Sequence, residues 1–258
     1  MDRIENIDFC IRYLLEQNRT QADIPATLPE KQRLLRALMN VWEPQPLSGE
    51  FLHAQDAELQ AQLQDKGVVS LEDIAASADT PLLWQGDITR LRVDAIVNAA
   101  NSQGLGCWHP LHACIDNAIH SAAGLQLRQE CDNVLRGGEI ATGEALITEA
   151  YNLPCRHVLH TVGPIIPDGV PTKEQEAQLA NCYRNCLGLA ESNGCRSIAF
   201  CCISTGEFHF PNRRAAEIAI DVVHSWLHGT QAASLRTVIF NVFKDIDYDI
   251  YRELLAAR

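Results

Sequence analysis

Basic side chains are scarce in this sequence. Its 258 residues include 21 Lys and Arg against 33 Asp and Glu, which gives a formal net charge of −12. Proteins that bind duplex DNA neutralise its phosphates with Lys and Arg, so this deficit argues against nucleic acid as a partner. A ligand that carries phosphate would have to be held largely by backbone N–H groups and helix N-termini.

Long apolar runs are missing as well. No stretch approaches the roughly 20 apolar residues that a membrane-spanning helix needs. The first ten residues, MDRIENIDFC, contain neither the basic region nor the apolar region of a signal peptide. We therefore expect a cytoplasmic protein with no membrane partner. Hydrophobic residues make up 47% of the chain, which is enough for a sizeable core and excludes a wholly disordered protein.

Cysteine, in contrast, is abundant, and nine of the ten cysteines lie between residues 107 and 202. In a chain without a signal peptide we expect thiols, some of them buried and some of them metal ligands, rather than disulfides. Cys182 and Cys186, one helical turn apart, and the neighbours Cys201 and Cys202 have the apolar surroundings of core thiols.

The hydrophobic pattern changes near residue 80. Before it, apolar side chains recur at helical spacing, whereas beyond it short apolar runs alternate with helical segments, as in an α/β domain. We predict a helical extension over residues 1–80, packed on a main domain over residues 81–258; a module that docks a partner is the alternative for the extension. The predicted strands are 95–98, 145–148, 157–162, 197–203 and 235–243, and the predicted helices of the main domain are 113–123, 125–136, 174–193, 212–228 and 245–256.

The densest chemistry lies between residues 104 and 120. Cys107, His112 and Cys114 form an array of two thiols and one imidazole, the ligand types that suit Zn²⁺. Three protein ligands leave a fourth position open, as in catalytic zinc sites. His109 is a second candidate for the imidazole, and spacing alone leaves that choice open. The competing interpretation is a core thiol at Cys114 and a surface histidine at His112.

Asp116 and His120 follow on the start of a predicted helix. They lie four residues apart, so they share one face of it. A carboxylate beside an open metal site is a candidate base or substrate-orienting group. Compensation of the helix dipole by Asp116 is the simpler alternative.

Two turns complete the candidate features. The segment 204–208, Ser-Thr-Gly-Glu-Phe, joins an apolar strand to a helix and can present consecutive N–H groups to an anion, although it lacks the Gly-Lys-Ser/Thr of a Walker loop. Asp87 lies in a turn before the strand 95–98, where its carboxylate can accept a hydrogen bond from an exocyclic amine or stabilise the turn itself.

Taken together, the segment from Leu82 to the C-terminus resembles the macrodomain family, and specifically its zinc-containing ADP-ribosyl hydrolase branch. The first 80 residues resemble the extension that this branch carries. The motifs are GDIT at 86–89, VDAIVNAAN at 93–101, IDNAIHSAAG at 115–124, TGEA at 142–145, HTVGP at 160–164 and ISTG at 203–206.

The resemblance implies a three-layer α/β/α sandwich with a mixed central sheet and ADP-ribose in a cleft at the ends of the strands. It implies that Asp87 accepts the adenine amine beside Ile88, that Phe243 stacks on the adenine, and that Asn101 meets the distal ribose. The diphosphate would be wrapped by the loop of Ser204, Thr205, Gly206, Glu207 and Phe208.

The resemblance also implies a catalytic role for Asp116 and one Zn²⁺ ion. The loop before Asp116 matches the signature G-C-x-x-P-x-H-x-C of the zinc branch, which selects Cys107, His112 and Cys114 as ligands and leaves His109 in a variable position. The expected activity is zinc-dependent hydrolysis that removes ADP-ribose from modified protein side chains.

Expected partners are ADP-ribose and a mono-ADP-ribosylated protein, with a lipoyl-carrier protein implied by the resemblance, and we expect a monomer. The alternative function is an ADP-ribose reader that binds without turnover, because one fold can serve both roles. A nucleic-acid module using the same cleft is disfavoured by the net charge.

Overall fold

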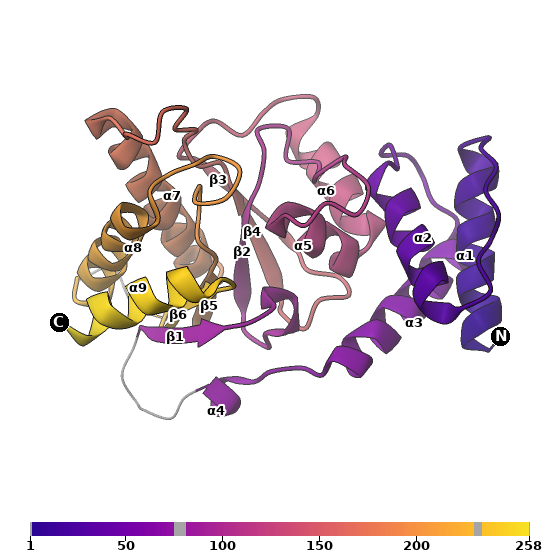
Figure 1. Cartoon of the computed structure of the whole chain (residues 1–258), viewed down its shortest axis with the longest axis horizontal. Helices are drawn as coiled ribbons and strands as arrows, with labels where there is room; N and C mark the ends of the chain where they lie inside the picture. Colours follow the sequence, from indigo (N-terminus) through magenta and orange to yellow (C-terminus); the bar gives the residue numbers. More distant parts are fainter. Residues whose placement is uncertain (1, 75–80, 230–233, 258) are drawn as a thin grey trace.

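A six-stranded sheet forms the centre of the molecule (Figure 1). The structure, a computed structural model, describes residues 2–74, 81–229 and 234–257. The strand order is β1-β6-β5-β2-β4-β3, and every neighbouring pair is parallel except β3 with β4. The predicted mixed sheet is therefore confirmed. The strands are β1 (Leu82–Gln85), β2 (Ala95–Ala99), β3 (Ala145–Glu149), β4 (His157–Thr161), β5 (Ser197–Phe200) and β6 (Thr237–Val242).

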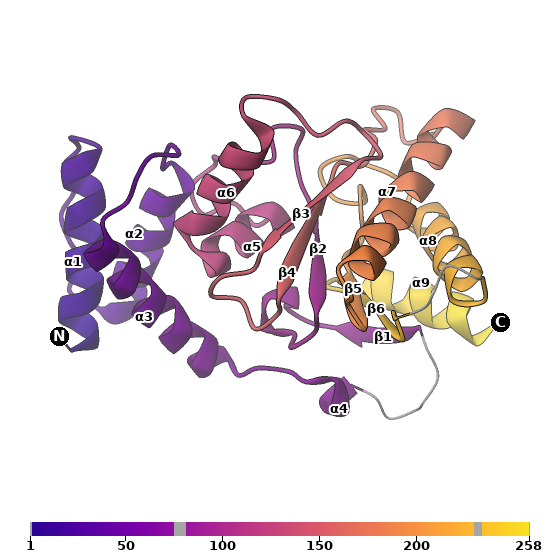
Figure 2. The same cartoon turned by 180° about the vertical axis from the view of Figure 1, so that it is seen from behind.

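Helices cover both faces of this sheet, as the three-layer expectation requires. One face carries α5 (Ile115–Ala123) and α6 (Leu125–Leu135). The other carries α7 (Lys173–Ser192), α8 (Asn212–Leu227) and α9 (Asp245–Ala256), as Figure 2 shows from behind. Because both faces are covered, the central strands β2, β5 and β6 are almost entirely buried and consist mainly of apolar residues.

The N-terminal helices form a separate layer on the outer side of α5 and α6 (Figure 1). The short α4 (Leu71–Ile74) lies apart from this layer, and its Leu71 and Ile74 pack against the core around the sheet. The layer consists of α1 (Arg3–Gln17), α2 (Leu28–Asn40) and α3 (Gly49–Lys66). Their apolar faces enclose a core of their own around Trp42 and Phe51, to which α6 contributes Leu125. The predicted boundary at residue 80 lies outside the described residues. Every helix in the described part is too short or too polar to cross a membrane.

Two strands differ from the sequence prediction. We did not predict β1, because its four residues are too few to show an alternating pattern and, among the strands that the structure describes, it pairs with β6 alone. The strand predicted over 197–203 ends at Phe200. The apolar run continues, but Cys201, Cys202 and Ile203 leave the sheet and lead into Ser204, which adopts a φ of 63° and turns the chain.

Candidate active site

One cleft of about 760 Å³ lies at the carboxyl edge of the parallel strands. β2 and β5 are neighbours in the sheet, but the segment after β2 leads to a helix on one face and the segment after β5 leads to a helix on the other. Open α/β sheets bind ligands at the point between two such strands. All the site residues expected from the sequence line this cleft, although they come from five separate segments of the chain. They are Asp87, Ile88, Asn101, Cys107, His112, Cys114, Asp116, Ser204, Thr205, Gly206, Glu207, Phe208 and Phe243.

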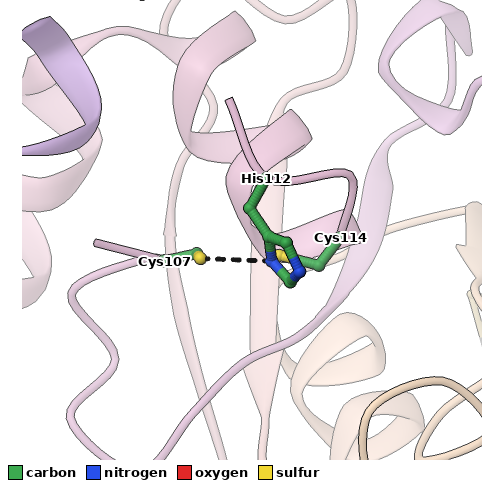
Figure 3. A group of neighbouring side chains, drawn as sticks. All are labelled: Cys107, His112 and Cys114. Carbon is green, nitrogen blue, oxygen red and sulfur yellow. Dashed lines mark hydrogen bonds between the residues drawn. The ribbon is translucent and has the colours of Figure 1, made fainter. Parts of the chain in front are cut away.

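Cys107, His112 and Cys114 converge at one end of the cleft (Figure 3). Their nearest ligand atoms all lie within 4.8 Å of one another, and Cys107 Sγ is 3.5 Å from His112 Nδ1. Tetrahedral zinc, with Zn–S of about 2.3 Å and Zn–N of about 2.0 Å, separates sulfur and nitrogen by about 3.5 Å. The donor set and its spacing therefore fit zinc. His109, which spacing had left as a candidate, does not join this group.

Cys114 has a second role, as the N-cap of α5. Its Sγ accepts a hydrogen bond from the N–H of Asn117 at 3.4 Å. Burial raises the pKa of the Cys114 thiol to about 12, so this thiol keeps its proton at neutral pH unless a cation replaces it.

Asp116 lies in the first turn of α5 and is almost completely buried, with 5% of its surface exposed. Its Oδ1 accepts a hydrogen bond from Asn98 Nδ2 at 2.8 Å, and its Oδ2 lies 3.4 Å from Asn101 Nδ2. Burial raises the pKa of Asp116 to about 6, which the Asn98 bond and the charge of Arg128 partly oppose. At neutral pH the carboxylate is mostly ionised and can accept a proton.

Asn101 secures the chain between β2 and the metal-ligand loop. Its Nδ2 donates to the carbonyl of Gly106 at 3.1 Å, and its Oδ1 accepts from the N–H of Gly104 at 3.1 Å. The expected ribose contact would therefore come from a side chain that is already held in place.

A buried histidine network lies beneath Asp116. His160 Nδ1 lies 3.2 Å from Asn98 Nδ2, and its Nε2 lies 3.0 Å from the hydroxyl of Thr148. His120 Nε2 lies 3.6 Å from Asp116 Oδ1. Although His120, Cys131 and His160 cluster closely enough to hold a metal, both ring nitrogens of His160 already have partners, so we interpret this cluster as packing beneath the carboxylate.

The loop 204–208 borders the cleft and reaches the metal ligands, because Glu207 Oε1 lies 3.8 Å from His112 Nε2. The N–H of Phe210 donates to Ser204 O at 2.9 Å, and Phe208 O accepts from Ile166 N at 2.8 Å. Gly163 permits this packing, because a Cβ there would lie 1.9 Å from Ser204 Oγ. We assigned no role to Gly163 from sequence, although it lies within the HTVGP motif.

The opposite end of the cleft carries Asp87 and Phe243. Asp87 Oδ1 accepts from the N–H and the hydroxyl of Thr89, so this carboxylate does stabilise its turn. Its Oδ2 faces Lys66 Nζ at 3.3 Å, a contact from α3 that sequence reasoning missed. Ile88 is buried beside it, whereas Phe243 is 76% exposed at the rim of the cleft.

A ligand cleft at the carboxyl edge of a mixed sheet, bordered by a strand-to-helix loop, is typical of an α/β ligand-binding fold. Comparison with known proteins identifies the family. The family model described as Macro domain matches residues 97–219. A protein-ADP-ribose hydrolase of Treponema medium is 48% identical over 264 residues, covering 99% of this chain and 100% of that protein. One from Staphylococcus aureus (strain MRSA252) is 42% identical over 262 residues, covering 98% and 97%.

Solved structures agree. The Trypanosoma brucei macrodomain in complex with ADP-ribose superposes with a TM-score of 0.65 at 32% identity, over 85% of this chain and 94% of that one. The Oceanobacillus iheyensis macrodomain with ADP gives 0.61 at 39% identity, over 70% and 93%. This chain belongs to the macrodomain family.

Proposed function

We propose that this protein is a protein-ADP-ribose hydrolase that removes mono-ADP-ribose from modified protein side chains and uses one zinc ion. The observation that carries the proposal is that one cleft holds both a buried, ionisable carboxylate, Asp116, and the array of Cys107, His112 and Cys114. The names of the relatives that match nearly the whole chain support the same reaction.

The geometry suggests how ADP-ribose would lie. The adenine would occupy the end with Asp87 and Phe243, and the diphosphate would run along the backbone of loop 204–208. The distal ribose would then reach Asn101 and Asp116. This arrangement needs few basic side chains, which is consistent with a net charge of −12.

The reaction adds water across the bond between the distal ribose and the protein side chain. Asp116 would orient the water and accept its proton, the hydroxyl would remain on the carbon that the water attacks, and the bond from that carbon to the leaving oxygen would break. The proton would then pass from Asp116 to the leaving oxygen, or to solvent where that oxygen leaves as a carboxylate. Asn101 would hold the ribose while the side chain leaves. Zinc held by Cys107, His112 and Cys114 would supply Lewis-acid polarisation of a ribose hydroxyl, the leaving oxygen or the water.

The test is release of ADP-ribose from a mono-ADP-ribosylated protein by the wild type, Cys107→Ala and Asp116→Ala. We expect Asp116→Ala to slow release by about 10²- to 10⁴-fold, the range for loss of a general base. Cys107→Ala should lose both bound zinc and activity. Cys155→Ala, which removes a partly buried thiol outside the cleft, should behave as the wild type.

Two results would contradict the proposal in different ways. Unchanged rates in both Cys107→Ala and Asp116→Ala would exclude the proposed metal-site mechanism. Binding of ADP-ribose in calorimetry without any release by the wild type would identify the protein as a reader of the modification.

A further inference from the structure

The N-terminal extension reaches the loop that carries the candidate metal ligands. Arg36, on α2, donates from Nη2 to the backbone carbonyl of His112 at 3.2 Å. The same guanidinium holds Asn117 Oδ1, from Nη2 at 2.7 Å and from Nε at 3.1 Å. Arg36 thus connects His112 to the first turn of α5, although Arg36 precedes both by more than seventy positions in the sequence.

Asn40, one helical turn beyond Arg36, fixes the residue before His112. Its Oδ1 accepts from the N–H of Leu111 at 2.9 Å, and its Nδ2 donates to Ser121 Oγ at 3.0 Å. Leu111 has a φ of 60°, a left-handed conformation that is strained for a residue with a side chain. This backbone persists only where surrounding contacts hold it, and the buried Asn40 provides one of them.

Contacts of two further residues, Asn117 and Arg128, link the rest of the loop to the same helix. Asn117 Nδ2 donates to the carbonyl of His109 at 2.9 Å. The guanidinium of Arg128 donates to the carbonyl of Met39, in the last turn of α2, and to that of Trp42 just beyond it. It also stacks over Trp108 at 4.2 Å from the ring centre. The backbone groups of His109, Leu111 and His112 are therefore tied to α2, directly or through Asn117 on α5. The Trp108 ring is linked to α2 through Arg128 on α6.

We infer that the extension is a positioning element for the metal ligands, with Arg36 and Asn40 fixing the loop so that Cys107, His112 and Cys114 converge. The inference rests on the proposed zinc site. Neither residue would touch the metal; each acts through the backbone next to His112. Outer contacts of this kind orient metal ligands, and losing one typically weakens metal binding by about 10- to 100-fold.

The experiment is zinc titration of the full chain in competition with a chromophoric chelator. We expect Arg36→Ala and Asn40→Ala to raise the zinc Kd about 10- to 100-fold. The matched control is Arg33→Ala, which removes an exposed guanidinium from the same helix and should leave the Kd within about twofold. Thermal unfolding of the metal-free variants is measured in parallel, because a merely structural role would lower Tm and leave the zinc Kd unchanged.

Arg36→Lys keeps the positive charge and the aliphatic stem but cannot donate in two directions from a planar group, so it should fold and still weaken zinc binding. If the wild type binds zinc and all three variants bind it as tightly, the inference is wrong and the proposed zinc site stands. If the wild type binds no zinc, the proposed zinc site fails and this inference fails with it.

Discussion

Asn98 and Asp116 meet beneath the cleft, where the Asn98 amide nitrogen lies 2.8 Å from Asp116 Oδ1. Asn98 is fully buried on β2, and Asp116 lies in the first turn of α5. Their hydrogen bond therefore ties the central strand to the helix that carries the candidate base. The same amide nitrogen lies 3.2 Å from His160 Nδ1. Asn98 therefore positions Asp116 without reaching the cleft itself.

Replacing Asn98 should impair both stability and hydrolysis. In Asn98→Ala the buried carboxylate loses a charge-assisted hydrogen bond, which should destabilise the protein by about 1–3 kcal/mol and lower the rate of ADP-ribose release. Chemical denaturation and the release assay measure the two effects. Asn185→Ala is the control, because the Asn185 side chain donates a hydrogen bond to Gly143 O at 2.7 Å outside the cleft. If Asn98→Ala turns over as fast as Asn185→Ala, Asp116 does not depend on this bond.

Gly163→Ala should weaken ligand binding by displacing the neighbouring loop. The added methyl would meet Ser204 Oγ at 1.9 Å and Ile203 Cγ2 at 2.9 Å, so the start of the loop must move. We expect the Kd for ADP-ribose, measured by calorimetry, to rise at least about tenfold, since a shifted loop misaligns its N–H groups. Gly188→Ala provides the comparison, because its Cβ would find only Trp226 at 3.9 Å. If Gly163→Ala binds ADP-ribose as tightly as the wild type, loop 204–208 does not belong to the proposed binding site.

Phe243→Ala should reduce affinity without reducing stability. The ring is 76% exposed, so its loss removes little buried area from the folded protein. Stacking of a base on an aromatic ring contributes about 1–3 kcal/mol, which predicts a Kd roughly 5- to 150-fold higher for both ADP-ribose and ADP. Val170→Ala, which trims an exposed side chain elsewhere, should change neither quantity. Equal affinities for the wild type and Phe243→Ala would place the adenine away from this residue.

Asp94 should make the free energy of unfolding depend on pH in the acidic range. Partial burial alone would raise the pKa of Asp94, but hydrogen bonds from the N–H groups of Arg196 and Ser197 and from the Ser197 hydroxyl outweigh it and hold the pKa below its ordinary value. A lowered folded-state pKa stabilises the protein above the unfolded-state pKa of about 3.9, and this contribution is lost as pH falls through the folded-state value.

Asp94→Asn should therefore be less stable than the wild type by about 1 kcal/mol at pH 7, and the difference should close as the pH falls below about 4. Urea denaturation across this range measures it. A difference that stays constant into acid would mean that the charge of Asp94 contributes nothing to these bonds.

Local sequence patterns predicted the parts of the site that lie within one short segment. The metal-ligand loop and Asp116 occupy ten consecutive positions, so their ligand types and spacing could be recognised directly. The helices and most strands followed from the 3.6- and 2-residue hydrophobic periods. Four-residue β1 offered too little pattern, and the apolar character of Cys201 to Ile203 concealed the end of β5.

Contacts between distant segments could not be predicted in this way. Arg36, Asn40 and Lys66 look like ordinary polar residues of helices. Only the packing of the extension against α5 brings Arg36 and Lys66 to the cleft and Asn40 to the backbone of Leu111. Gly163 gave a signal as part of a motif, but its role depends on the position of Ser204, forty residues later. Whether residues 1–80 and 81–258 are separate domains stays a prediction.

The strand order has a consequence for how the chain folds during synthesis. Helix α1 packs against both α2 and α3, which are near it in the sequence, so most of their shared core can form as soon as residue 66 has left the ribosome. β1 instead pairs with β6 alone among the described strands, so the sheet is complete only after residues 237–242 have been made. The helix that bears Arg36 and Asn40 is thus made first, and the later loop at residues 107–114 can fold against a surface already in place.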